Sequence, residues 1–317
     1  MKDLKIRWRL FADETEPTTR QRGINVYRQL QSLGYNADAW DGKEEADIII
    51  LQYSMRMLDE ALATGATVVA DINDQVFAKH HPYHAETMRG LQRVPAVVAG
   101  SPRLAEHLER LHPFVRMIEE GVDSRYFAVE RKKREGTGCL WMGMHDNLTY
   151  FNEIDGVLER LSKEFDFTVH FVCPPLDGFK KSNKAKVEKK PYKGVFHEWT
   201  METLLEQMAL ADMAVAPLFQ NEWGWGKCCN KLASFAAAGL PVVASDVPSY
   251  RAVVVSGKDA YLAYTEEDWY TMLKKLLSDR LFRERMGKSG KKRVKEELSL
   301  EKIAGDWLQL FREVRPR

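Results

Sequence analysis

The amino-acid sequence predicts an α/β protein made of two doubly wound domains with parallel sheets. Short apolar runs alternate with helical patterns along the whole chain, as in repeated βαβ units. The charged stretch at 128–137 interrupts this alternation once, after which it starts again. The 317 residues, 44% of them hydrophobic, are more than one core usually organises. We therefore expect two Rossmann-like domains, residues 1–128 and 129–317, facing each other across a cleft.

In the first half, each apolar run between turn residues predicts a strand. These runs are KIRWRLFA, YNADAW, ADIIILQYS, TVVADIND and AVVAGS. Apolar residues at helical spacing predict helices near 22–34, near 55–64 and over PRLAEHLERL.

The second half repeats the plan. Its predicted strands are CLWMGM, FTVHFVCPP, GVFHEW, MAVAPL and LPVVASD, and its predicted helices lie near 148–164, over METLLEQMALA and near 228–238. From residue 265, apolar residues at helical spacing, interrupted by glycines, predict three further helices. We expect these helices to cover the outer face of the second sheet.

Composition narrows the class of protein. The 47 Lys and Arg residues balance 46 Asp and Glu residues, so the chain as a whole is not a polyanion binder. The four cysteines form no CxxC pair, which favours reduced thiols and no zinc. The sequence shows no signal-peptide pattern and no apolar run of about 18 residues. We expect a cytoplasmic protein with no transmembrane segment.

The segment NEWGWGKCCNK, residues 221–231, has the composition of a diphosphate-binding turn. Gly224 and Gly226 allow a close approach of the backbone to a ligand, and Lys227 stands just before the helix expected near 228–238. Free N–H groups and the positive end of the helix dipole attract a diphosphate, whose charge a lysine neutralises. An ordinary helix-to-strand step of the sheet remains the alternative.

The longer stretch APLFQNEWGWGKCCNKLASFAAAGLPVVASDVPSYRAVV resembles the donor-binding segment of GT-B glycosyltransferases. The resemblance is to the large retaining family that includes sucrose-phosphate synthase and the phosphatidylinositol mannosyltransferases. Four further segments are similar to the family's motifs in the same order: VVADINDQVF, AGSPRLAEHL, GVDSRYF and WMGMHDNLTYF. The likeness covers most of the chain. It implies a GT-B fold and transfer of a hexosyl or pentosyl unit from a UDP- or GDP-sugar to an acceptor hydroxyl, with retention.

The resemblance also implies residue roles. The nucleotide-sugar is expected to contact a loop at 195–199 and Gly143, Lys227, Asn230, Lys231, Ser234 and Arg22. The residues expected to take part in the chemistry are Asp74, His145 and Glu222. Fixed donors and lysines can stabilise a leaving diphosphate, so no metal ion is required. Solvated or helix-start side chains are the alternative for His145, Glu222 and Arg22.

Two positions depart from the family pattern. Ser234 stands where the family usually has a glutamate that holds the ribose. Asn73 stands where a histidine precedes the aspartate, so Asp74 alone is left to move a proton. These changes keep two alternatives open, a non-catalytic nucleotide-sugar-binding protein and a GT-B epimerase. His80, His81 and His84 lack a third well-placed ligand, so we expect no metal site.

The acceptor is not identified by the sequence. A glycan, a lipid-linked sugar, a small molecule and a hydroxymethylated base of DNA all remain open. Seven lysines between Lys180 and Lys193 could contact a polyanion. A solvated basic loop is the favoured interpretation of that run.

Overall fold

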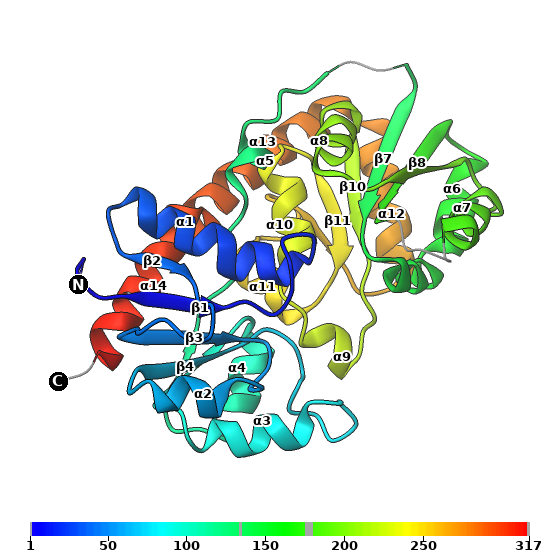
Figure 1. Cartoon of the computed structure of the whole chain (residues 1–317). Coiled ribbons are helices and arrows are strands. Elements are labelled where there is room, and N and C mark those ends of the chain that lie inside the picture. Colours follow the sequence, from blue (N-terminus) through cyan, green and yellow to red (C-terminus); the bar gives the residue numbers. More distant parts are fainter. Residues whose placement is uncertain (1, 133–134, 175–179, 316–317) are drawn as a thin grey trace. The chain divides into compact units, whose positions relative to one another are not determined.

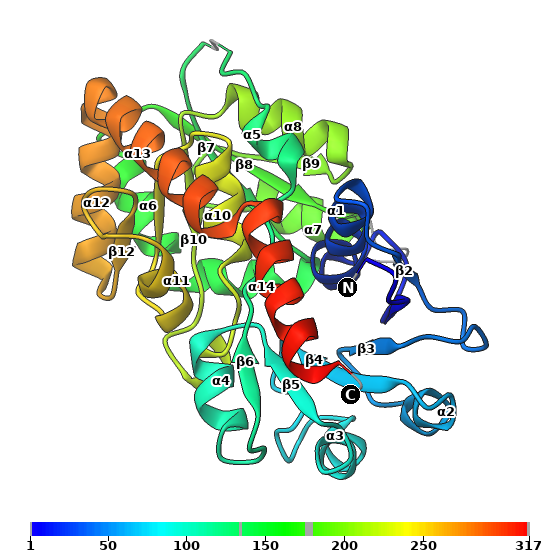
Figure 2. The same cartoon turned by 90° about the vertical axis from the view of Figure 1, so that its left-hand side faces the viewer.

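The computed structural model of the chain describes residues 2–132, 135–174 and 180–315. The chain divides into two compact units (Figures 1 and 2), and each is described by itself. The N-terminal unit comprises Met1–Asp123, Trp225–Cys229 and Leu298–Arg317, and the C-terminal unit comprises Ser124–Gly224 and Asn230–Glu297. This division differs from the single boundary expected between residues 128 and 129.

The N-terminal unit contains a parallel sheet with strand order β2-β1-β3-β4-β5-β6. The central strand β3 carries three consecutive isoleucines, all fully buried, as expected for a parallel strand covered on both faces. The strands are β1 (Ile6–Arg9), β2 (Ala37–Ala39), β3 (Ile48–Gln52), β4 (Thr67–Ile72), β5 (Ala96–Ala99) and β6 (Val115–Met117).

Helices flank this sheet, and all but one lie where the sequence predicts them. They are η1 (Thr19–Ile24, a π-helix), α1 (Asn25–Ser32), α2 (Leu58–Ala63), α3 (His84–Leu91) and α4 (Pro102–Leu108). Helix α3 and strand β6 were not predicted, because each shows only a short apolar pattern. Helix α4 begins with a Ser101 cap whose hydroxyl accepts a hydrogen bond from Leu104 N, followed by Pro102.

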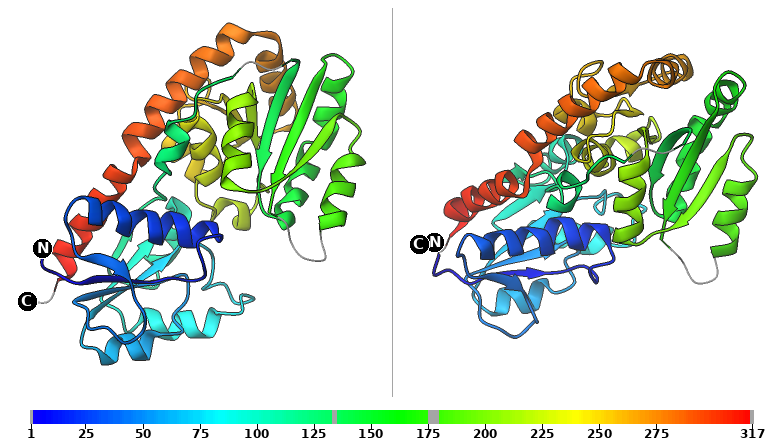
Figure 3. Two further views of the ribbon diagram at one scale, coloured as in Figure 1. Left: turned by 45° about the horizontal axis from the view of Figure 1, so that its top comes forward. Right: turned by 90° about the horizontal axis from the view of Figure 1, so that it is seen from above.

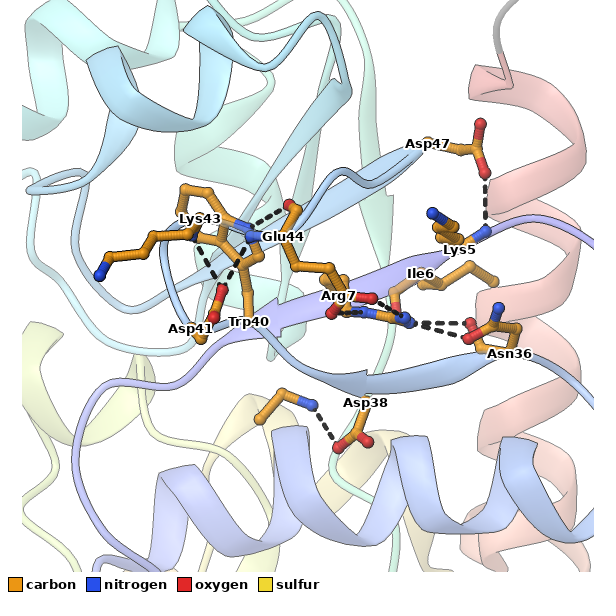
Figure 4. A network of polar contacts seen from close by, with 11 residues as sticks. Lys5, Ile6, Arg7, Asn36, Asp38, Trp40, Asp41, Lys43, Glu44 and Asp47 are labelled. Atoms are coloured by element: carbon orange, nitrogen blue, oxygen red, sulfur yellow. Dashed lines mark hydrogen bonds and ion pairs between the residues drawn. The ribbon is translucent and has the colours of Figure 1, made fainter.

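A buried arginine holds the edge of this sheet (Figure 4). Arg7 of β1 is 5% exposed and donates to Glu44 Oε1 at 2.8 Å and to Asn36 Oδ1 at 3.1 Å. Trp40 Nε1 donates to the carbonyl of Glu44 at 3.0 Å. These bonds fix the three-residue strand β2 and the loop after it, which would otherwise be a weakly held edge.

The last helix, α14 (Leu300–Val314), belongs to the N-terminal unit, which corrects the expectation that all three terminal helices cover the second sheet. It lies beside α1, as Figure 3 shows with α14 in red and α1 in blue. Trp307 and Phe311 pack against Trp8 of β1 with ring centroids 5.7 and 5.9 Å apart. Burying these rings in the core of the N-terminal unit stabilises α14 there, although α14 directly follows a helix of the C-terminal unit in the chain.

The C-terminal unit contains a parallel sheet with strand order β12-β11-β10-β7-β8-β9. All five predicted strands are present, and β12 is added after them. The strands are β7 (Thr137–Met142), β8 (Phe167–Cys173), β9 (Gly194–Glu198), β10 (Met213–Ala216), β11 (Val242–Ser245) and β12 (Tyr261–Ala263). The segment 195–199 is therefore mostly strand β9 rather than a loop.

The helices of this unit include α10 (Asn230–Ala237), whose side chains from Leu232 to Ala237 are all buried. Gly239 follows it with φ +76°, a left-handed helix end, as expected from the sequence. The others are α5 (Ser124–Phe127), η2 (His145–Glu153, a 3₁₀ helix), α6 (Asp155–Ser162), α7 (Lys180–Glu188), α8 (Met201–Leu210), α9 (Glu222–Trp225, which ends in the N-terminal unit), α11 (Pro248–Val253), α12 (Glu266–Ser278) and α13 (Arg280–Leu298).

Helix α7 replaces the basic loop expected at 180–193. Val187 of this helix is 1% exposed and joins the core, so one apolar side chain anchors an otherwise charged segment. The side chains of residues 180–183 lie outside the described part of the structure. In the described ranges, no helix has both the length and the apolar character needed to cross a membrane.

Candidate functional site

Each sheet has one position where the strand order reverses. In the N-terminal sheet, β1 has β2 on one side and β3 on the other; in the C-terminal sheet, β7 lies between β8 and β10. Doubly wound sheets bind ligands outside the carboxyl ends of their strands at this switch point. The candidate positions are therefore the carboxyl ends of β1 and β3 in one unit, and of β7 and β10 in the other.

Gly143 directly follows β7, at the switch point of the C-terminal sheet. Its N–H donates to the carbonyl of Val172 at 3.1 Å. A Cβ atom at this position would lie 2.6 Å from the Trp141 ring, so a larger residue would collide with that ring. Close contact with the Trp141 ring therefore accounts for the glycine at this position.

Helix α10 follows β10 in the chain, after α9 and the segment Trp225–Cys229. Lys231 lies in its first turn, with Nζ 5.6 Å from the centroid of the Tyr150 ring. That ring packs edge-on against Phe219, which follows β10, at 4.7 Å. Gly143 and Lys231 thus follow the two strands, β7 and β10, that flank the switch point of this sheet, and their role at a donor site stays a prediction.

Ser234 is 2% exposed, and its hydroxyl donates to Asn230 Oδ1 at 3.3 Å within α10. The hydroxyl of Ser234 thus bonds within its own helix. Glu222 begins α9 and is exposed, and His145 begins η2, but its side chain lies outside the described part of the structure.

The segment Trp225–Cys229 joins the N-terminal unit. Lys227 Nζ lies 2.8 Å from Asp74 Oδ2, and both side chains are largely buried, at 24% and 17% exposure. Asp74 Oδ1 accepts from the Gln75 N–H at 2.9 Å. The sequence assigned Lys227 to the donor and Asp74 to the acceptor, whereas the structure pairs them.

The two glycines before Lys227 also differ from expectation. A Cβ on Gly224 would lie 1.9 Å from the carbonyl oxygen of Phe219, and one on Gly226 would lie 2.5 Å from Gln75 Nε2. Ser101 Oγ donates to the carbonyl of Gly226 at 2.9 Å. Close contacts within the protein therefore explain these glycines, rather than close approach to a ligand.

Arg22 is 1% exposed and forms a buried ion pair with Asp71 of β4. Its Nη1 also donates to the carbonyl of Ile118 at 2.9 Å. Burial alone would lower the pKa of Arg22, but the charge and hydrogen bonds of Asp71 outweigh burial and raise it. The guanidinium is charged, and it is bonded to Asp71 and to the Ile118 carbonyl inside the N-terminal unit. The sequence had suggested instead that it contacts the donor phosphates.

Glu119 and Cys229 form a second buried pair that the sequence reasoning missed. Cys229 Sγ lies 3.5 Å from Glu119 Oε2, and Glu119 Oε1 is buried without a hydrogen-bond partner. Burial, followed by the nearby Glu120 charge, raises the pKa of Glu119 to about 8. Two adjacent glutamates ahead of GVD in IEEGVD were the available signal.

Two of the histidines near residue 80 form hydrogen bonds with nearby backbone groups. His84 Nδ1 lies 2.6 Å from the carbonyl of Phe77, and His81 Nδ1 accepts from the Tyr83 N–H at 3.2 Å. Desolvation lowers the pKa of His81. No cluster of three metal-ligating side chains occurs among the residues that the structure describes.

Three lysines of the 180–193 run pair with carboxylates of their own unit. Lys193 lies 2.6 Å from Asp166 Oδ1, Lys190 pairs with Asp155, and Lys184 lies 3.7 Å from Glu188. These neighbours reduce the charge that the run offers to a polyanion.

The family model of the glycosyl transferases group 1 matches residues 140–279. This range contains the carboxyl end of β7, all of β10 and α10, and hence the switch point of the C-terminal sheet. The match supports glycosyltransferase activity. No curated protein sequence matches the chain.

Several solved structures share the fold over nearly the whole chain. A glycosyltransferase from Rickettsia africae is 14% identical, with a TM-score of 0.75 over 98% of this chain and 99% of that chain. Sucrose-phosphate synthase from Thermosynechococcus elongatus is 13% identical, with a TM-score of 0.74 over 97% and 98%. HepE from Anabaena, solved with UDP and glucose, is 11% identical, with a TM-score of 0.73 over 98% and 99%. The chain therefore has the two-domain GT-B fold, and its residues 140–279 match the glycosyl transferases group 1.

Proposed function

We propose that this chain transfers a hexosyl or pentosyl unit from a UDP- or GDP-sugar to an acceptor hydroxyl, with retention and without a metal ion. The observation that carries the proposal is that the family match contains the switch point of the C-terminal sheet. HepE, which has the same fold, was solved with UDP and with UDP-glucose. The C-terminal unit is the donor-binding part in this proposal.

The donor diphosphate is held by backbone and by one cation. The first N–H groups of α10 have no partner within the helix and carry the positive end of its dipole. Lys231 in the first turn adds a full charge, and the backbone of Gly143 lies at the end of β7. As the nucleoside diphosphate leaves, its growing charge is stabilised by groups that are already oriented.

Asp74 of the N-terminal unit accepts the proton of the acceptor hydroxyl. Its carboxylate is held by the Gln75 N–H and by Lys227, so its orientation is fixed before the acceptor binds. Lys227 acts as a positioning residue for Asp74 in this arrangement. Glu222 and His145 remain candidates for contacts with the transferred sugar.

Calorimetry with UDP, GDP and their glucose and mannose derivatives tests the donor assignment. We expect one nucleotide to bind, with affinity unchanged by EDTA, and Lys231→Met to weaken it. Lys189→Met is the matched control, because Lys189 is an exposed lysine of the same unit. If no nucleoside diphosphate or nucleotide sugar binds, the proposed function is wrong.

A non-catalytic nucleotide-sugar-binding protein is the second candidate. It is favoured by Ser234, which stands at the position of the family's glutamate and bonds within its own helix. Mass spectrometry of the bound donor separates the candidates. Transfer or slow hydrolysis identifies a transferase, interconversion of donor sugars without acceptor identifies an epimerase, and an unchanged donor identifies a binding protein.

A further inference from the structure

Two aromatic side chains occupy the switch point of the N-terminal sheet. Phe11 follows β1, and Tyr53 directly follows β3, so the two strands that flank the reversal each deliver one ring. Their ring centroids are 4.4 Å apart, and Phe11 is 38% exposed. The Phe11 N–H donates to Gln52 Oε1 at 3.1 Å, which holds the turn after β1 against the end of β3.

The backbone of Tyr53 is strained. Its φ of +67° is the only positive value among the non-glycine residues of the described chain. A bulky side chain rarely adopts this conformation, and such residues cluster at ligand-binding positions. Its N–H donates to the carbonyl of Asp71 at 2.9 Å, so sheet pairing continues up to the residue that turns.

Two more rings extend this surface, which we call the aromatic platform and define as Phe11, Tyr53, His81 and Tyr83. Tyr83 meets Tyr53 edge-on at 6.0 Å, and His81 lies 6.2 Å from Tyr53 and 5.4 Å from Tyr83. All four side chains are at least partly exposed. The guanidinium of Arg56 lies 4.5 Å from the centroid of the Tyr83 ring.

Asp74, the proposed proton acceptor, follows β4, which pairs with β3 in a register that sets Gln52 opposite Asp71, so Asp74 and Tyr53 follow the carboxyl ends of neighbouring strands. Burial raises the pKa of Tyr53, and the charge of Asp74 raises it further. The turn after Phe11 carries three acidic residues, Asp13, Glu14 and Glu16, and the charge of Glu16 also acts on Tyr53. Negative charge at this edge opposes the approach of a phosphate backbone.

We infer that the aromatic platform binds an uncharged sugar ring of the acceptor, with the apolar C–H face of the ring against Phe11 and Tyr53. This inference rests on the proposed function and names the acceptor class as carbohydrate. Aromatic faces carry partial negative charge and attract the polarised C–H groups of a pyranose. A hydroxyl of the same sugar then reaches Asp74, because Tyr53 and Asp74 follow the ends of the paired strands β3 and β4.

Saturation-transfer NMR with the methyl glycosides of glucose, galactose, mannose and N-acetylglucosamine, in the presence of UDP, tests the inference. We expect Phe11→Ala and Tyr53→Ala each to weaken binding of at least one glycoside by about tenfold, and Tyr53→Phe to preserve it. Tyr53→Gly removes the ring while accommodating the positive φ, so it separates loss of the ring from loss of folding. Tyr35→Ala is the matched control, because Tyr35 lies in the same unit before the amino end of β2.

UDP affinity measured in the same variants separates the two proposals. If UDP binds but no glycoside does, or if the ring-deletion variants bind glycosides like the wild type, the platform inference is wrong and the proposed function stands. If UDP fails to bind the wild type, the proposed function itself fails. Binding of hydroxymethylcytosine duplex DNA that weakens steeply between about 50 and 300 mM NaCl, and that is lost in Tyr53→Ala, overturns the carbohydrate assignment in favour of DNA.

Discussion

The carboxyl edges of the two sheets have the same topology but different chemistry. The edge of the N-terminal sheet holds buried charge, in the Arg22–Asp71 and Asp74–Lys227 ion pairs and in Glu119. The edge of the C-terminal sheet carries Gly143 after β7, the start of α10 and Lys231. The fold therefore determines where a ligand can bind, and the side chains determine which one. Fixed charge suits proton transfer, and the N–H groups of a helix start suit a diphosphate.

The largest expected effect concerns the buried charge of the N-terminal edge. Arg22→Met leaves Asp71 buried without its cation, so we expect the free energy of unfolding to fall by about 3–5 kcal/mol. Arg116→Met is the control, since Arg116 pairs with Glu313 at the surface and we expect a loss below about 1 kcal/mol. Urea unfolding measures both. Equal losses would mean that burial of the charge is unimportant here.

Asp74→Asn separates chemistry from donor binding. We expect kcat to fall about 10²- to 10⁴-fold, because the amide cannot accept the acceptor proton, while UDP affinity stays the same. Asp59→Asn is the control, because Asp59 is an exposed aspartate of the same unit. A parallel loss of UDP affinity would place Asp74 at the donor rather than at the acceptor.

Comparing two lysines decides which edge binds the diphosphate. We expect Lys231→Met to weaken UDP binding by about 1.5–3 kcal/mol through loss of a charge-assisted contact. Lys227→Met should mainly lower kcat, because Lys227 is paired with Asp74. Calorimetry and steady-state kinetics measure the two effects. The reverse pattern would restore the sequence-based assignment of Lys227 to the diphosphate.

Glu119 makes stability depend on pH. Its pKa is raised to about 8 from 4.5, so the folded state keeps a proton that the unfolded state releases between these values. The free energy of unfolding therefore falls as pH rises through this window, by up to about 1.4 kcal/mol per pH unit. Glu119→Gln should remove this slope, whereas Glu109→Gln, at an exposed position of the same unit, should keep it. Thermal unfolding at several pH values measures the difference.

The smallest effect is expected on the basic helix α7 and the residues after it. Lys184→Gln combined with Lys193→Gln should change stability by less than about 0.5 kcal/mol, because both ion pairs are exposed. Binding to duplex DNA should stay weak in both proteins. A steep salt dependence in the wild type that the variant loses would instead show a polyanion site on this unit.

Periodicity predicted most elements correctly, because buried parallel strands need continuous apolar runs and helices need a 3.6-residue repeat. It missed β6, because Val115–Met117 is short and contains an arginine, and β12, because Tyr261–Ala263 is equally short. At the candidate site, sequence order placed Gly143 and Lys231 near strand ends. The contact between Asp74 and Lys227 joins residues 153 positions apart in the chain, so local sequence patterns could not predict it.

The sequence by itself determined the two doubly wound domains, the family resemblance and which residues are proposed for the donor edge, since these follow from local patterns and short motifs. Only the tertiary structure decided that α14 and the segment Trp225–Cys229 join the N-terminal unit. The physical reason is that Trp307 and Phe311 bury their rings against Trp8, and that Lys227 forms an ion pair with Asp74. Such pairings depend on which surfaces the folded chain brings together, and they produce no hydrophobic periodicity in the sequence.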